Sequence, residues 1–93
     1  MSELINQVID LSNINSKKDL HLTFKNHLSF PEFYGENWDA LWDAINGLVE
    51  MPNVLTLNGW NNFENRFPED SKILKEIIED YNNIDSKFQI QTC

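Results

Sequence analysis

The sequence predicts a small α/β domain with a three-stranded parallel sheet and about four helices. Short apolar stretches at residues 7–11, 53–57 and 87–91 have the length of strands and are bounded by turn residues. Between them lie longer stretches whose apolar residues recur at three- and four-residue spacing, as in helices that bury one face. Strands that are separated by helices are joined by crossovers, which makes the sheet mainly parallel and leaves the strand order open.

The length of the chain predicts one folding domain over residues 1–93. Its first strand, at residues 7–11, leads into a turn and then into a helix that Ser16 or Asp19 can cap. The buried stripe of this helix comprises Leu20, Phe24 and Leu28. Pro31 disfavours helical geometry in the residue before it, so the helix is expected to end before this proline.

A second helix is expected at residues 38–46, with Asn37 as its N-cap and Gly47 as the residue at which it stops. Its apolar face consists of Trp38, Leu41, Ala44 and Ile45. We expect this face to attach the helix to the core, because a helix that buries one side is stabilised mainly by that packing.

The second strand, at residues 53–57, is followed by a short third helix that ends near Pro68. The fourth helix is expected to begin at Asp70 or Ser71. In the last strand, at residues 87–91, apolar and polar residues alternate, so one sheet face is expected to be incompletely covered. The helices should therefore pack mainly on the other face.

Acidic residues outnumber basic ones by 15 to 7, which gives a formal net charge of −8. Such a charge repels nucleic acids and anionic membranes and accelerates encounters with basic partners. We therefore expect no nucleic acid and no membrane as partners. A cytoplasmic location is expected, because Cys93 is the single cysteine and the N-terminus lacks the features of a signal peptide.

The candidate functional site is a polar stripe beside the apolar face of the second helix. Asp39 and Asp43 lie one turn apart on it, and Asn46 continues it. The aromatic residues expected at its margins are Phe33, Tyr34 and Trp42. Residues 26–65 contain no Lys or Arg that would neutralise the stripe. An acidic array beside exposed aromatic rings can occupy a cationic phosphate-binding cleft, because carboxylates accept paired hydrogen bonds from arginine as phosphates do.

A small metal-dependent hydrolase is a weaker alternative, because paired carboxylates also bind divalent metals or act as acid and base. No third ligand, phosphate-binding loop, nucleophile elbow or histidine-rich motif accompanies them, so we expect no enzyme, no metal and no cofactor. His21 and His27 are expected at the surface or boundary of the first helix. The other alternative is an acidic interaction module whose basic partner is not a nuclease.

Residues 30–43 read Phe-Pro-Glu-Phe-Tyr-Gly-Glu-Asn-Trp-Asp-Ala-Leu-Trp-Asp, with an aromatic pair, a glycine and an Asp-Ala-Leu-Trp-Asp run in order. This stretch resembles the barstar family of ribonuclease inhibitors, and the likeness extends weakly over the chain. The resemblance implies an intracellular bacterial inhibitor that is monomeric when free. It would bind a basic extracellular ribonuclease or nuclease toxin one to one, as an immunity protein does, and block the active site with the second helix and the adjoining loop.

The resemblance also implies which residues contact the partner. Asp39 and Asp43 would meet the catalytic Arg, Lys and His groups of the enzyme, with Asp43 as the central anchor. The remaining implied contacts are Phe33, Tyr34, Trp42, Asn46, Gly47, Leu48 and Glu79. Glu79 is the first choice for an acidic contact from the fourth helix, and Glu76 is the second choice.

Overall fold

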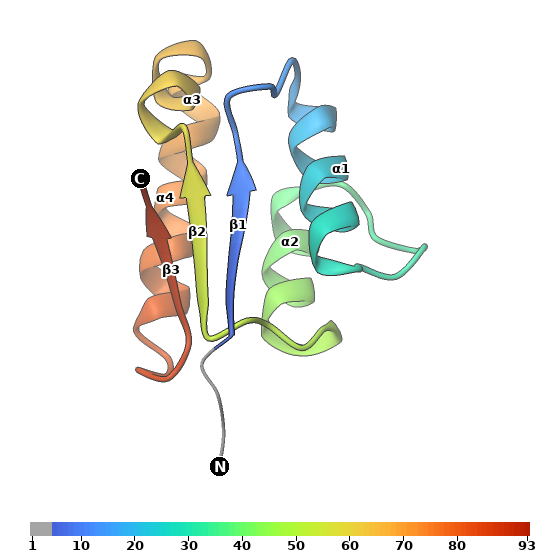
Figure 1. Ribbon diagram of the computed structural model, residues 1–93. Helices are drawn as coiled ribbons and strands as arrows, with labels where there is room; N and C mark the ends of the chain where they lie inside the picture. Colours follow the sequence, from blue (N-terminus) through green and yellow to red (C-terminus); the bar gives the residue numbers. More distant parts are fainter. Residues whose placement is uncertain (1–4) are drawn as a thin grey trace.

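The computed structural model describes residues 5–93 and confirms the α/β prediction. The elements in chain order are β1 (Asn6–Asp10), α1 (Lys17–Leu28), α2 (Trp38–Asp43), the π-helical turn η1 (Ala44–Leu48), β2 (Val54–Asn58), α3 (Trp60–Arg66), α4 (Pro68–Asn82) and β3 (Gln89–Thr92). The sheet has the strand order β1-β2-β3, and β2 pairs in parallel with both neighbours (Figure 1). The sheet order, which the sequence left open, therefore follows the chain order.

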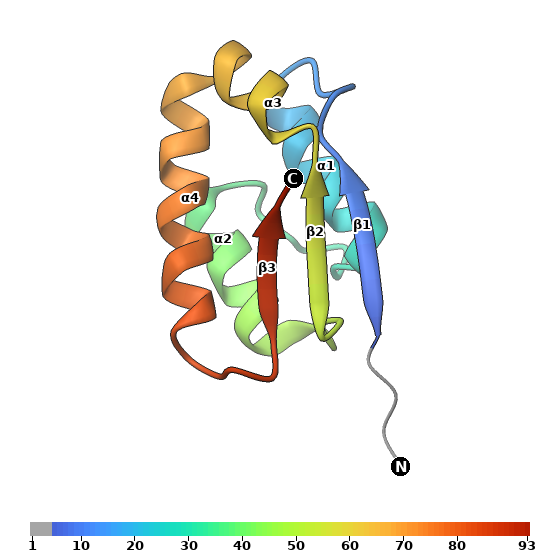
Figure 2. The ribbon, with the colours of Figure 1, turned by 60° about the vertical axis from the view of Figure 1, so that its left-hand side comes forward.

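The sheet buries one face and leaves the other face open, as the alternating last strand predicted. The buried face carries Ile9, Leu55, Leu57 and Ile90. On the opposite face Val8 is 53% exposed and pairs with Thr56, which in turn pairs with Gln91. The helices lie on the buried side, so the core forms between them and one side of the sheet (Figure 2).

The last residue of α4 reaches the outer edge of β3. The Asn82 side chain accepts a hydrogen bond from the backbone N–H of Ile90 at 2.7 Å and donates one to the carbonyl oxygen of Ile90 at 2.8 Å. A single amide group thereby satisfies both backbone groups of a strand residue in the way a neighbouring strand would. The contact joins the end of α4 to the sheet.

Two of the predicted helix boundaries are wrong. The second helix does not stop at Gly47, because η1 continues to Leu48 and Gly47 lies inside it without the positive φ of a helix stop. The fourth helix begins at Pro68 rather than at Asp70 or Ser71. Proline suits the first turn, because an N–H group there has no hydrogen-bond partner within the helix and proline lacks this group. Ser16, one of the two candidate caps of α1, accepts a hydrogen bond from the Asp19 backbone. The strands are shifted by one or two residues from the predicted ranges.

His21 belongs to the core, so its predicted position at the surface is wrong, whereas His27 is exposed. The Nδ1 atom of His21 lies 2.6 Å from the Tyr34 hydroxyl, and its ring centroid lies 5.0 Å from that of Trp38. Tyr34 is also buried, which corrects the expectation that its ring is exposed beside the acidic stripe. The contact connects α1 with the loop that leads into α2.

The buried pair is uncharged near neutral pH. Burial lowers the pKa of His21, and the positive charge of Lys17 lowers this pKa further, while the carboxylates of Glu36 and Asp70 oppose the shift. Burial and the negative charge of Glu36 raise the pKa of the Tyr34 hydroxyl. A proton added to His21 would place an unwanted positive charge in the core.

We expect acid to destabilise the fold through His21. Unfolded histidine binds a proton near its ordinary pKa of 6.5, whereas folded His21 stays neutral to lower pH. The unfolded state therefore binds more protons between the two pKa values, and the free energy of unfolding falls by at most about 1.4 kcal/mol per pH unit as the pH decreases through this window. Urea denaturation between about pH 7 and pH 5 should show a steeper loss for the wild-type protein than for His21→Gln. Equal slopes for the wild-type protein and His21→Gln would contradict the assignment.

Candidate functional site

The acidic stripe of α2 is exposed because the opposite side of this short helix is fixed to the core. Leu41 is buried at 1% exposure. The N-cap side chain of Asn37 accepts a hydrogen bond from the Ala40 backbone at 2.7 Å, which defines the first turn. Asp39 and Asp43 are both exposed one turn apart, and the positive end of the helix dipole favours a carboxylate at Asp39.

A shallow hollow of about 320 Å³, called here the first hollow, lies between α2 and α4. It is lined by Trp38, Asp39, Trp42, Ile73, Glu76, Ile77 and Asp80. Carboxylates from two helices therefore border one apolar wall of indole and isoleucine side chains. None of these lining residues is Lys or Arg.

The carboxylates of the first hollow have no ion-pair partner in the described part of the chain. Within residues 5–93 the one ion pair joins Lys25 and Glu32, with a distance of 3.8 Å between Nζ and Oε2. Lys17 comes near the hollow, because its Nζ lies 5.5 Å from the centroid of the Trp38 ring, but it pairs with no carboxylate. The hollow therefore presents negative charge that a partner can neutralise.

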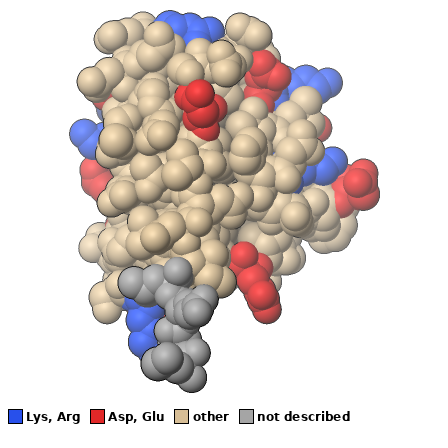
Figure 3. All heavy atoms as spheres, viewed as in Figure 1, with Lys and Arg blue, Asp and Glu red and all other residues tan. Residues whose placement is uncertain are grey.

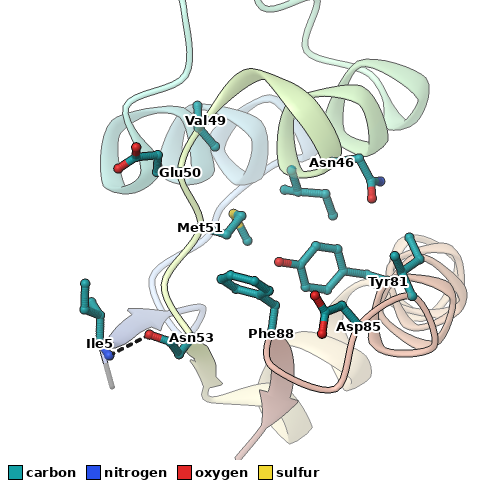
Figure 4. Close-up of a pocket in the computed structure, with 11 residues that line it drawn as sticks. Ile5, Asn46, Val49, Glu50, Met51, Asn53, Tyr81, Asp85 and Phe88 are labelled. Carbon is teal, nitrogen blue, oxygen red and sulfur yellow. Dashed lines mark hydrogen bonds between the residues drawn. The ribbon is translucent and has the colours of Figure 1, made fainter. Parts of the chain in front are cut away.

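A larger hollow of about 620 Å³, called here the second hollow, continues between η1 and the C-terminal end of α4. Its lining residues are Ile5, Ile45, Asn46, Val49, Glu50, Met51, Asn53, Tyr81, Ile84, Asp85 and Phe88. Figure 4 shows the side chains of Met51, Tyr81 and Phe88 converging, with Asp85 beside the two rings and Glu50 farther out. The floor of this hollow is apolar and its charged residues are acidic.

Asn46, which lines the second hollow, is hydrogen-bonded to a residue of the first. Its side-chain amide donates a hydrogen bond to the Trp42 carbonyl oxygen at 2.8 Å, one turn earlier in the chain. Trp42 lines the first hollow and Asn46 lines the second. The two hollows are neighbours, because α2–η1 and α4 contribute residues to both linings, with Tyr81 as the α4 residue of the second, and they are together called the groove here.

The structure brings together only part of the predicted contact surface. Asp39, Trp42 and Glu76 line the first hollow, while Glu79, the preferred acidic residue of the fourth helix, lines neither hollow. The predicted residues that are exposed outside both hollows are Phe33, Asp43, Gly47, Leu48 and Glu79. Phe33 is 75% exposed and Leu48 is 48% exposed, so both apolar side chains are accessible to a partner.

Four residues of the first hollow were not predicted as contacts from the sequence, namely Trp38, Ile73, Ile77 and Asp80. Asp80 lies one turn after Glu76, and Ile77 lies one turn after Ile73, so helical spacing alone predicts two stripes on α4. The packing of α4 beside α2 decides which stripe borders the hollow. That choice depends on contacts between distant segments, and the local pattern does not contain it.

Several other classes of site have little support from the described residues. Residues 5–93 contain no group of three His, Cys, Asp or Glu side chains arranged to hold a metal ion. No helix in this range combines the length and apolar character that crossing a membrane requires. The face viewed in Figure 1 carries few charged side chains, and they are scattered rather than clustered (Figure 3).

Two comparisons with known proteins agree with the motif at residues 30–43. The sequence model of the family described as "Barstar (barnase inhibitor)" matches residues 5–92. A protein of Bacillus subtilis (strain 168), named "Putative ribonuclease inhibitor YrdF", is 34% identical to this chain over 86 residues. That alignment covers 89% of this chain and 92% of the relative. The family match includes both walls of the groove.

We expect removal of one carboxylate from the first hollow to stabilise the free protein. Glu76 and Asp80 are like charges one helical turn apart, a pairing that destabilises a helix by about 0.2–0.5 kcal/mol at low salt. Asp80→Asn should therefore raise the midpoint of thermal denaturation slightly at low ionic strength and less at high ionic strength. The matched control Glu64→Gln removes one charge from α3, away from the groove, and should have a smaller effect. A lower midpoint for Asp80→Asn would show that its carboxylate is stabilising.

Proposed function

The chain belongs to the barstar family, and we propose that it inhibits a basic extracellular ribonuclease or nuclease toxin by occupying the active site. The observation that carries the proposal is the set of unpaired carboxylates in the groove, where α2 supplies Asp39 and α4 supplies Glu76 and Asp80. The family match and the name of the Bacillus subtilis relative support the same role. We further propose a one-to-one complex formed in the cytoplasm by a monomeric inhibitor.

The proposed contact uses carboxylates in place of phosphate. An active site that cleaves RNA must bind phosphate, and arginine does so with paired hydrogen bonds that a carboxylate also accepts. Asp43 is exposed at the end of α2 and serves as the central anchor, while Asp39 binds a second cationic group from the first hollow. The indole ring of Trp42, which lines the same hollow, adds a face on which a guanidinium group can lie.

The groove is formed before the partner arrives, which favours tight binding. Asn37 caps α2, and Leu41 holds its buried side, so the carboxylates need little rearrangement. The exposed ring of Phe33 stacks at the edge of the ribonuclease active site. The inhibitor itself catalyses no reaction. Leu48 and Gly47 extend the contact along the exposed side of η1.

Replacement of Asp43 should strongly weaken inhibition. An RNA cleavage assay with a guanyl-specific microbial ribonuclease, and with the ribonuclease of the source organism, measures the effect. Asp43→Ala should weaken inhibition by about 30-fold or more, which corresponds to about 2 kcal/mol and is typical of an interface hot spot. Glu64→Ala makes the same change in charge on α3 and should inhibit almost as well as the wild-type protein. Unchanged inhibition by a folded Asp43→Ala variant would exclude the proposed site.

Association with the ribonuclease should slow steeply as salt is added. The net charge of −8 attracts a basic enzyme over a distance that salt shortens to ~10 Å at 0.1 M ionic strength. Stopped-flow measurements should show an association rate that falls with ionic strength, while the dissociation rate changes much less. An association rate that does not depend on salt would argue against attraction by the acidic surface.

A further inference from the structure

Of the partner contacts expected from the sequence, Asn46 alone lines the second hollow. We propose that it receives a large apolar side chain that the partner ribonuclease carries next to a lysine or arginine. This inference rests on the proposed inhibitor function and extends the contact surface from the first hollow to the amino ends of the strands. The occupant is thereby defined by two properties, an apolar body and a neighbouring positive charge.

The position of the second hollow makes it a surface feature separate from the usual ligand crevice of α/β sheets. Ile5, Asn53 and Phe88 each lie just before a strand, so the hollow opens at the amino ends of all three strands. Small ligands of such sheets usually bind at the carboxyl ends. After η1 the chain becomes extended at Val49 and leads to β2, and residues of this segment line one side of the hollow.

The floor of the second hollow suits an aromatic or long aliphatic side chain. Met51, Tyr81 and Phe88 converge there, as Figure 4 shows, and a thioether beside two rings adapts well to an added aromatic group. Ile84 lies at the same site and is 62% exposed, so apolar surface is left uncovered by the described residues. Insertion of a side chain would bury this surface.

The charges around the second hollow favour a cationic neighbour over an anionic one. Its charged lining residues are Glu50 and Asp85, and Lys and Arg are missing from the residues that line it. Asp85 is fixed, because its carboxylate accepts a hydrogen bond from the Lys87 backbone at 2.9 Å. Burial, together with the negative charge of Asp85, raises the pKa of the Tyr81 hydroxyl, so this floor residue adds no charge near neutral pH. The side chain of Lys87 is exposed and does not line the hollow.

The second hollow lies next to the first, so we take the same ribonuclease to occupy both. Residues of α2–η1 and α4 line both hollows, and Trp42 of the first lies one helical turn before Asn46 of the second. A basic protein that places cationic groups against Asp39 and Asp80 therefore covers the neighbouring part of the same groove. An apolar side chain of this basic protein, farther along the groove, can then enter the second hollow.

The chemistry of the second hollow can be tested without a ribonuclease. The ¹⁵N-labelled protein is titrated with tryptophanamide, which joins an indole to a positive charge, and with N-acetyltryptophan, which joins it to a negative charge. Tryptophanamide should shift the backbone signals of Asn46, Met51 and Ile84 at concentrations several-fold lower than N-acetyltryptophan does. An equal response to both compounds, or shifts confined to other parts of the molecule, would overturn the proposal.

Inhibition by exposed-residue variants tests the role of the hollow in the complex. Ile84→Lys places a positive charge at the hollow, whereas Val8→Lys places the same charge on the open sheet face, where Val8 is 53% exposed. Ile84→Lys should weaken inhibition of the ribonuclease about tenfold relative to Val8→Lys, mainly through faster dissociation. Equal inhibition by the two variants would overturn the inference, even where Asp43→Ala confirms the proposed function. Absence of inhibition by the wild-type protein would refute the proposed function and the ribonuclease as occupant. The titration would still decide whether the second hollow prefers an indole that carries a positive charge.

Discussion

A helix of six residues does not hold its shape in water, so every group that α2 presents depends on the packing of its buried side. Leu41 and Ile45 enter the core from this side, and Trp38 packs against the ring of His21. Through the hydrogen bond between His21 and Tyr34, α1 also fixes the loop that precedes the helix. The positions of the exposed carboxylates are therefore set by apolar packing and one buried polar contact.

This attachment allows the surface to keep an unfavourable arrangement of charge. Side chains of like charge move apart if the chain can move. The carboxylates of Asp39 and Asp80 stay near each other, because the core holds α2 and α4 side by side. The repulsion is small compared with the free energy gained by burying the apolar sides of α2 and α4. In the proposed complex a cationic partner would remove the repulsion, so part of the driving force for that binding would already be present in the free protein.

Local patterns were sufficient to predict most of the fold. The strands and helices were found because their apolar spacing is a property of neighbouring residues, and the exposed stripe of Asp39 and Asp43 follows from the same periodicity. Gly47 was misjudged because a glycine near a helix end predicts a stop only when its φ is positive, and here the π-helical turn continues through it.

Features made by distant segments were not predictable in this way. The burial of His21 requires Tyr34, which lies 13 residues later on a different segment. The choice of Glu76 and Asp80 over Glu79 depends on the rotation of α4 beside α2. The second hollow combines residues from the starts of three strands with η1 and the end of α4, so no single stretch of sequence contains its signature. The hollows are consequences of tertiary packing.

The amide of Asn82 has a consequence for how this protein behaves in a crowded solution. An outermost strand with free backbone groups is a template onto which another polypeptide can add, and repeated addition leads to aggregates. Asn82 forms hydrogen bonds with both backbone groups of Ile90, so another chain cannot pair with β3 at this one of its four residues. The helix that forms one wall of the groove therefore also limits growth of the sheet, so substitutions near its end can change self-association without touching the acidic surface.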